Sequence, residues 1–175
     1  MMKKRRLLIV VDYQCDFVDG SLGFKQAKLI EEPLVNLINA FAETGDDIIF
    51  TKDIHDSNYL KTEEGKNLPV IHCQKGDASS EIYGLVNQLS KGRRIISKNT
   101  FGAKKLFPYL SKNKYDEVVL AGLVSTICVL SNAVIVKTLL PNAHVVVDAH
   151  CSASPDKDME EKAYDVLKNL HVEIR

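Results

Sequence analysis

Short runs of branched apolar residues alternate along the chain with stretches in which apolar residues recur every three or four positions. Continuous apolar runs are typical of strands that are buried on both faces of a parallel sheet. They predict strands at 7–11, 47–51, 94–97, 117–121, 144–147 and 172–174. The helical spacing predicts helices at 27–41, 78–89, 102–110, 127–140 and 156–170.

This alternation predicts an α/β fold in which a six-stranded parallel sheet lies between two layers of helices. No linker, internal repeat or low-complexity tract is visible, so we expect one domain over residues 1–175. The polar stretch 56–77 has no periodicity and is predicted to be a loop. Loops of this length in compact domains are often functional.

The charge balance excludes some classes of function. The 175-residue chain has 23 Lys plus Arg and 23 Asp plus Glu, so its formal net charge is zero. Proteins that bind nucleic acid usually carry a basic excess, so we expect no such partner. The basic run 3–6 is interpreted as a solvated terminus. The apolar run after it stops at Asp12, too short to cross a membrane, which favours a cytoplasmic protein.

One of the four cysteines is placed to be reactive. Cys15, Cys73, Cys128 and Cys151 form no C-x-x-C pair, so we expect free thiols. Cys128 falls in the first turn of the helix predicted after Gly122. Backbone N–H groups and the helix dipole favour a thiolate there, and the same N–H groups can hold an oxyanion. The alternative interpretation is a buried structural cysteine.

Asp12 and Lys98 also follow predicted strands. In open α/β sheets the ligand site lies beyond the carboxyl ends of the strands, so these side chains are candidates to join Cys128. Asp12 would accept the thiol proton and return it to a leaving group, and Lys98 would keep Asp12 ionised. A helix cap for Asp12 and a surface position for Lys98 are the alternatives.

A second set of residues favours a metal site. Asp53 and His55 lie on the same side of an extended segment, and His72 follows in the same predicted loop. Glu63 and Glu64 lie between the histidines and offer a further oxygen ligand. This chemistry suits Zn²⁺ or another divalent first-row metal such as Fe²⁺ or Mn²⁺. A chance D-x-H pair and a loop histidine are the alternatives.

Two aromatic residues each follow a candidate catalytic residue by a few positions. Phe17 follows Asp12, and Phe101 follows Lys98. Either ring can stack on a flat substrate, although most aromatic residues serve in core packing.

The motifs together resemble the isochorismatase-like cysteine hydrolases, in particular the nicotinamidase branch. The segment 12–17 resembles the family's D-x-Q-x-D-F motif, and 97–101 resembles its lysine motif. The segment 122–129 resembles its nucleophile turn, and Asp53, His55 and His72 match its metal motif. The motifs occur in the family's order and extend from the first strand to about Ala149.

The resemblance implies an isochorismatase-like, Rossmann-like fold and an activity. An Asp12–Lys98–Cys128 triad would cleave a small carboxamide through a thioester and release ammonia, with nicotinamide as the expected substrate. A metal held by Asp53, His55 and His72 would anchor the pyridine nitrogen, either directly or through bound water. The family also implies a cis peptide bond at Leu123–Val124, oxyanion donors at Val124 and Cys128, and an oligomer of identical chains.

The sequence departs from the family at two places. Ser125-Thr126 stands where the nucleophile turn usually has Thr-Asp, and a histidine common after the D-x-H is missing. Glu64 is placed to substitute for that histidine. Another small amide or an isochorismate-type vinyl ether is an alternative substrate. A receiver-like signalling domain is a remote alternative, because Asp12 lacks the adjacent acidic partner that such domains need.

Overall fold

The structure, a computed structural model, describes residues 4–175, so the first residue of the basic run lies outside it. Six strands form one parallel sheet in the order β3-β2-β1-β4-β5-β6. This confirms the predicted fold class. The strands are β1 Arg6–Val11, β2 Asp47–Asp53, β3 Arg94–Lys98, β4 Glu117–Leu123, β5 His144–Ala153 and β6 Glu173–Ile174.

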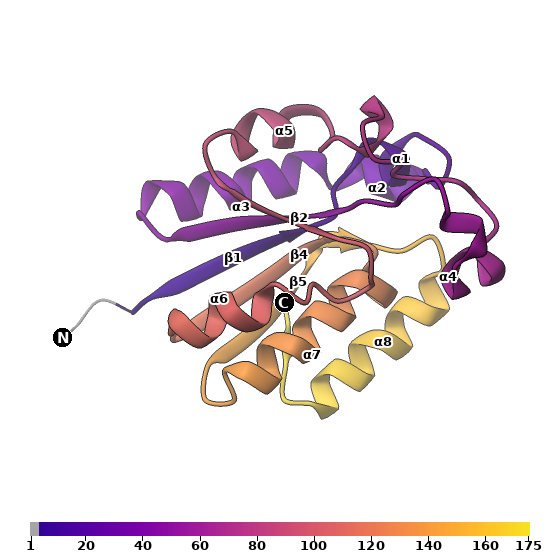
Figure 1. Cartoon of the computed structure of the whole chain (residues 1–175). Helices are drawn as coiled ribbons and strands as arrows, with labels where there is room; N and C mark the ends of the chain where they lie inside the picture. Colours follow the sequence, from indigo (N-terminus) through magenta and orange to yellow (C-terminus); the bar gives the residue numbers. More distant parts are fainter. Residues whose placement is uncertain (1–3) are drawn as a thin grey trace.

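Helices cover both faces of the sheet. Figure 1 shows α2, α3 and α5 above the sheet and α6, α7 and α8 below it. No helix among residues 4–175 is long and apolar enough to cross a membrane. The α-helices are α1 Cys15–Val18, α2 Lys25–Leu29, α3 Glu31–Glu43, α4 Glu63–Asn67, α5 Gly84–Ser90, α6 Leu106–Lys112, α7 Leu130–Leu139 and α8 Lys157–Asn169.

The central strand β1 explains why the sequence showed a continuous apolar run. Leu7, Ile9 and Val11 belong to the core between the sheet and the helices α6, α7 and α8. Leu8 and Val10 belong to the second core, between the opposite face of the sheet and the helices α2, α3 and α5. A strand between two helical layers buries both of its faces, so neither face is polar.

Three predicted helices are divided or shortened. The predicted helix 27–41 is α2 followed by α3, and Pro33 lies in the first turn of α3 as expected. The stretch 78–89 begins as a short 3₁₀ turn, and α5 starts only at Gly84, whose φ is 55°. The predicted helix 102–110 is α6, which begins at Leu106.

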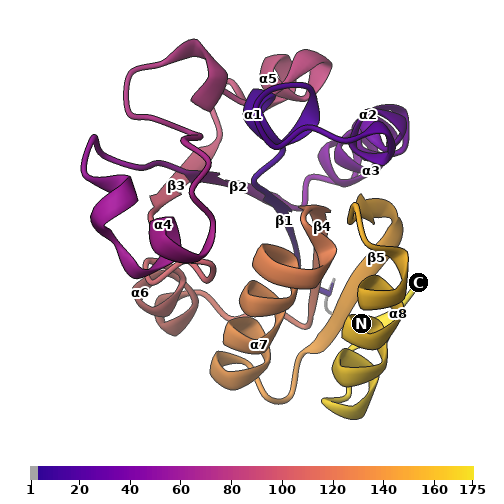
Figure 2. The same ribbon diagram turned by 90° about the vertical axis from the view of Figure 1, so that its right-hand side faces the viewer.

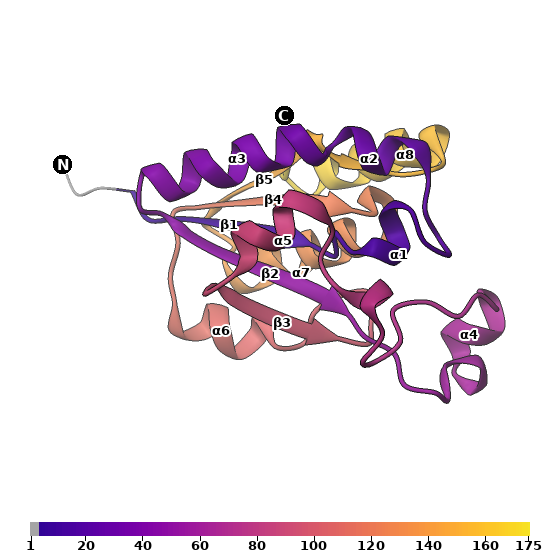
Figure 3. The same ribbon diagram turned by 90° about the horizontal axis from the view of Figure 1, so that it is seen from above.

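The segment predicted to be a loop, 56–77, contains ordered helical turns. A 3₁₀ turn spans Tyr59–Lys61, and α4 follows it. The Thr62 hydroxyl caps α4 by accepting a hydrogen bond from the Gly65 N–H at 3.0 Å. Figure 3 shows this segment standing out beyond the end of the sheet. Such short helices leave no periodic pattern, because they span little more than one turn.

The strand order reverses between β1 and β4, which defines the switch point at which ligands bind in such folds. After β4 the chain passes Gly122, whose φ is 121°, and a cis peptide bond at Leu123–Val124. It then forms a π-helical turn, Ser125–Val129, that leads into α7. The helix predicted from residue 127 therefore begins as this wider turn.

The strand β5 is longer than predicted and irregular. Val147 pairs with Leu120, whereas Ser152 pairs with Gly122, so four residues bulge between the two pairs. The continuation of β5 beyond the bulge runs beside the end of β4, next to Leu123. The bulge thus places residues 152–154 close to the turn that follows β4.

Candidate active site

The structure brings the three predicted catalytic residues together at the switch point. Asp12 follows β1, Lys98 ends β3, and Cys128 lies in the π-helical turn after β4. The Lys98 Nζ atom lies 2.6 Å from Asp12 Oδ2 and 3.5 Å from Cys128 Sγ. All three side chains are buried. Figure 2 views the molecule from the end at which the strands finish.

Asp12 is held in a strained and fully buried position. Its φ is 47°, and its Oδ1 atom accepts a hydrogen bond of 2.5 Å from the Thr51 hydroxyl. Burial raises the pKa of Asp12, and the Lys98 ammonium offsets part of that rise. A carboxylate with a raised pKa is a better proton acceptor, which suits the predicted role of Asp12 as a general base.

The surroundings of Cys128 favour a thiol, whereas the sequence predicted a thiolate. Burial and the neighbouring Asp12 carboxylate raise the pKa of Cys128 well above its ordinary value, and Lys98 lowers it only in part. Burial lowers the pKa of Lys98, but its ion pairs with Asp12 and Asp53 outweigh burial, so this pKa is raised. These shifts favour a thiol at Cys128 and an ammonium at Lys98, and the sulfur becomes nucleophilic as Asp12 takes its proton.

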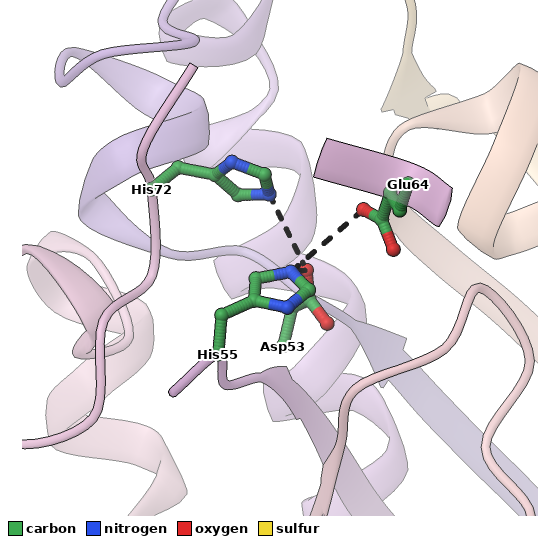
Figure 4. Close-up of side chains that lie close together, drawn as sticks. All are labelled: Asp53, His55, Glu64 and His72. Carbon is green, nitrogen blue, oxygen red and sulfur yellow. Dashed lines mark hydrogen bonds and ion pairs between the residues drawn. The ribbon is translucent and has the colours of Figure 1, made fainter. Parts of the chain in front are cut away.

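Asp53, His55, Glu64 and His72 form a second group, shown in Figure 4, whose ligand atoms all lie within 4.8 Å of one another. The His55 Nε2 atom lies 2.9 Å from Asp53 Oδ2 and 3.7 Å from Glu64 Oε1. The His72 Nε2 atom lies 3.7 Å from the same Asp53 oxygen. Glu64, the substitute expected from the sequence, thus joins the two histidines, whereas Glu63 is exposed.

The donor set fits a divalent cation. The Nδ1–H of His72 donates to the Val70 carbonyl at 2.7 Å, so Nε2 presents its lone pair to the group. Burial opposes ionisation of Asp53, but hydrogen bonds with His55 and His72 and the charge of Lys98 lower its pKa. An ionised carboxylate beside imidazole nitrogens is the mixed nitrogen and oxygen set that Zn²⁺ and related metals prefer.

Both groups open on one pocket of about 310 Å³. Its lining includes Cys128 of the catalytic group and Asp53, Glu64 and His72 of the second group. The Lys98 Nζ atom, 3.4 Å from Asp53 Oδ1, connects the two groups. The apolar lining includes both predicted stacking residues and is Phe17, Leu22, Phe24, Leu68, Phe101, Val124, Ile127 and Pro155.

The cis peptide bond expected at Leu123–Val124 is present, and Val124 lines the pocket. The Val124 carbonyl accepts hydrogen bonds from the N–H groups of Ile127 and Val129, which closes the turn around Cys128. The oxyanion role of this segment stays a prediction.

Gln14 is a functional side chain to which we assigned no role from the sequence. It is fully buried, and its amide brackets the backbone of Asp53: Oε1 accepts from the Asp53 N–H at 2.6 Å, and Nε2 donates to the Asp53 carbonyl at 2.8 Å. Nε2 also donates to the Ser80 carbonyl at 2.7 Å. Gln14, two residues after Asp12, therefore ties the segment after β1 to the strand that carries Asp53. Its place in the D-x-Q motif was the available signal.

Asn132 is a second such residue. Its Nδ2 donates to the Cys128 carbonyl at 2.8 Å, and its Oδ1 accepts from the Ala103 N–H at 2.8 Å. It thereby joins the nucleophile turn to the segment after β3 that carries Phe101. Its position four residues after Cys128, on the same helical face, was the signal in the sequence.

A thiol, a carboxylate and a lysine at the switch point of a parallel α/β sheet define a cysteine-hydrolase type of site. Residues 6–174 match the family described as Isochorismatase domain, and the chain belongs to this family. A Bacillus subtilis protein described as the uncharacterized isochorismatase family protein PncA is 31% identical over 142 residues, which cover 74% of this chain and 77% of that protein.

Solved structures of similar proteins agree with the family. The structure of nicotinamidase/pyrazinamidase PncA from Bacillus subtilis has a TM-score of 0.87 at 28% identity, covering 97% of this chain and 98% of that one. Pyrazinamidase of Pyrococcus horikoshii in complex with zinc has a TM-score of 0.85 at 25% identity, covering 98% of each chain. The family assignment replaces the receiver-like alternative.

Proposed function

We propose that this protein is a metal-dependent cysteine amidohydrolase that converts nicotinamide and water into nicotinate and ammonia. The observation that carries the proposal is that the Cys128 thiol and the metal-binding group line the same small pocket. Similar solved structures bear the names nicotinamidase and pyrazinamidase, which supports this substrate class.

The reaction follows from the three catalytic side chains. Asp12 takes the proton from Cys128 as the sulfur attacks the carboxamide carbon. The tetrahedral intermediate collapses to a thioester when the C–N bond breaks, and Asp12 gives its proton to the leaving ammonia. Asp12 then takes a proton from water, which hydrolyses the thioester and restores the thiol. Lys98 remains an ammonium throughout and stabilises the carboxylate form of Asp12.

The second group would position the ring. Asp53, His55, Glu64 and His72 would hold the metal, for which Zn²⁺ is the first candidate and Fe²⁺ or Mn²⁺ the alternatives. When bound, the metal supplies a cationic anchor for the pyridine nitrogen. Phe17 contributes an aromatic wall to the pocket and contacts the His72 ring at a centroid distance of 5.6 Å. Apolar walls of this kind orient a flat ring and exclude water.

The test compares two amides that differ only in the ring nitrogen. Purified, zinc-loaded protein should release ammonia from nicotinamide with a kcat/KM at least about tenfold above that for benzamide, since benzamide offers the metal no ligand. Cys128→Ala should abolish both activities. Equal rates for both amides would contradict the anchoring role of the metal. Rapid hydrolysis of another small amide with none of nicotinamide would overturn the substrate assignment.

The proposal includes a cytoplasmic enzyme that works as an oligomer of identical chains. The zero net charge of the sequence supports a small-molecule substrate rather than a nucleic-acid partner. Sedimentation-velocity measurements on the purified protein test the oligomer, and a single species with the mass of one chain would contradict it.

A further inference from the structure

A buried carboxylate outside the catalytic group contacts the nucleophile turn. Glu160 lies in the first turn of α8, and only 5% of its surface is exposed. Its Oε1 atom accepts a hydrogen bond of 2.6 Å from the Ser125 hydroxyl and a longer one of 3.3 Å from the Tyr164 hydroxyl. Its Oε2 atom lies 2.5 Å from Lys157 Nζ. Each oxygen of this carboxylate is therefore paired.

Ser125 occupies a sensitive place in the turn. It is fully buried, it is the first residue of the π-helical turn, and Cys128 lies in that same turn. The Ser125 hydroxyl donates to Glu160, whereas the other hydroxyl of the turn, on Thr126, lies a longer 3.3 Å from Ser154 Oγ. The bond to Glu160 is thus the shorter of the two hydroxyl bonds that hold the segment around the nucleophile.

The helix that carries Glu160 is itself fixed beside the pocket. Asp156 caps α8 by accepting a hydrogen bond of 2.9 Å from the Met159 N–H, and Asp156 also lines the pocket. Burying a carboxylate is unfavourable unless charged and hydrogen-bonding partners compensate, so a structural role alone would be served as well by an apolar side chain. The Glu160 side chain instead accepts a hydrogen bond from a donor of the catalytic turn.

We infer that Glu160 is a positioning residue, which holds Ser125 and thereby fixes the backbone N–H groups of the nucleophile turn in the geometry that a tetrahedral oxyanion requires. Stabilisation of such an oxyanion depends on donors whose positions are set in advance. Glu160 acts through Ser125 and touches no reacting atom. The inference rests on the proposed attack of Cys128 on a carbonyl, and it explains how this chain supports a turn with Ser125-Thr126 in place of Thr-Asp.

The experiment compares two reactions of the same sulfur. Acylation by p-nitrophenyl acetate forms a C–S bond through a tetrahedral oxyanion and expels p-nitrophenolate, which is followed by stopped-flow absorbance. Alkylation by iodoacetamide displaces iodide in one step without an oxyanion and is followed by mass spectrometry. A loss of preorganised donors slows only the first reaction.

Glu160→Ala should slow the acylation of Cys128 roughly 10- to 100-fold while alkylation stays within about threefold of the wild type. Glu160→Gln should recover part of the loss, because its amide oxygen can still accept from Ser125. Glu161→Gln, at the adjacent exposed position of α8, is the matched control and should leave both rates unchanged.

Parallel loss of both rates in Glu160→Ala would overturn the inference, because it indicates general loosening of the site, and so would an unchanged acylation rate. If Glu160→Ala does not fold, Ser125→Ala removes the same bond from the other side and should give the same selective loss. Failure of the proposed function appears separately, as wild-type protein that releases no ammonia from nicotinamide, since neither reagent here is nicotinamide.

Discussion

The catalytic group and the metal-binding group share one pocket but are built differently. Asp12 directly follows β1, Lys98 ends β3, and Cys128 lies in the turn after β4 of one parallel sheet. In the metal-binding group, by contrast, only Asp53 belongs to a strand, and the other ligands come from the segment 55–72 that stands out beyond the sheet (Figure 3).

We expect the two groups to respond differently to substitutions and to removal of the metal. Neighbouring strands fix the catalytic side chains through the hydrogen-bonding register; Val11 pairs with both Thr51 and Gly122 at the ends of the strands. The metal ligands depend on a few side-chain bonds, such as those of Gln14 and Asp16 to the backbone of Asp53 and Cys73. We expect the catalytic group to persist without metal, and the metal group to depend on local supports.

The largest expected effect separates chemistry from positioning. Cys128→Ala removes the nucleophile and should lower kcat for nicotinamide roughly 10⁴-fold or more, because no other group can form the thioester. Zinc binding, measured by titration calorimetry, should be unchanged, since Cys128 is not one of the ligands. Cys15→Ala, at a partly exposed cysteine, is the control and should retain activity. Loss of zinc binding in Cys128→Ala would show that the two groups are not independent.

The second prediction uses two adjacent glutamates on α4. Glu64→Gln should weaken zinc binding roughly 10- to 100-fold, because the amide replaces a charged oxygen ligand. Glu63→Gln should have no effect, because the Glu63 side chain is 84% exposed and lies outside the group. Alkylation of Cys128 should proceed at the same rate in both variants. Equal zinc affinities of the two variants would remove Glu64 from the ligand set.

The sequence predicted those features that depend on local patterns, namely the strands and the residues at their ends. The apolar runs located the strands, and the rule for strand ends then placed Asp12, Lys98 and Cys128 together. The metal ligands were found by residue type and spacing. The turns of α4 and the π-helical turn were missed, because each is too short to produce a periodic pattern.

Features that depend on distant contacts could not be predicted. Glu160 lies 35 positions after Ser125, and an acidic residue in the first turn of a helix is ordinary, since it complements the helix dipole. The thiol state of Cys128 is set by burial and by the charge of Asp12. The sequence pattern showed the favourable helix terminus but not the depth at which the sulfur is buried.

The third prediction concerns pH and the metal. Burial lowers the pKa of His72, but its hydrogen bonds with Asp53 and Val70 outweigh burial, so in the metal-free protein this pKa is raised. A protonated imidazole cannot bind metal, so zinc affinity should fall as the pH drops below that raised pKa, by up to about tenfold per pH unit. Calorimetry near neutral pH, in buffers of different ionisation enthalpy, should detect protons released on binding. The absence of proton release across this range would contradict the prediction.

The smallest effect is expected from Asp16, whose side chain holds the backbone of the metal-binding group in place. Asp16 Oδ2 accepts a hydrogen bond of 2.6 Å from the Cys73 N–H, next to His72. Burial opposes ionisation of Asp16, but the bonds from Cys73 and Ser21 lower its pKa. The resulting stability is present above the unfolded pKa and is lost as the pH falls through the lowered one. Asp16→Asn should therefore cost about 1 kcal/mol at neutral pH and make unfolding less sensitive to acid. Zinc affinity should fall only about threefold, because the backbone next to His72 loosens. The rate of Cys128 alkylation should be unchanged, because the sheet does not loosen. Asp19→Asn, three residues further along on the surface, is the control, and an equal loss of stability there would contradict a specific role for Asp16.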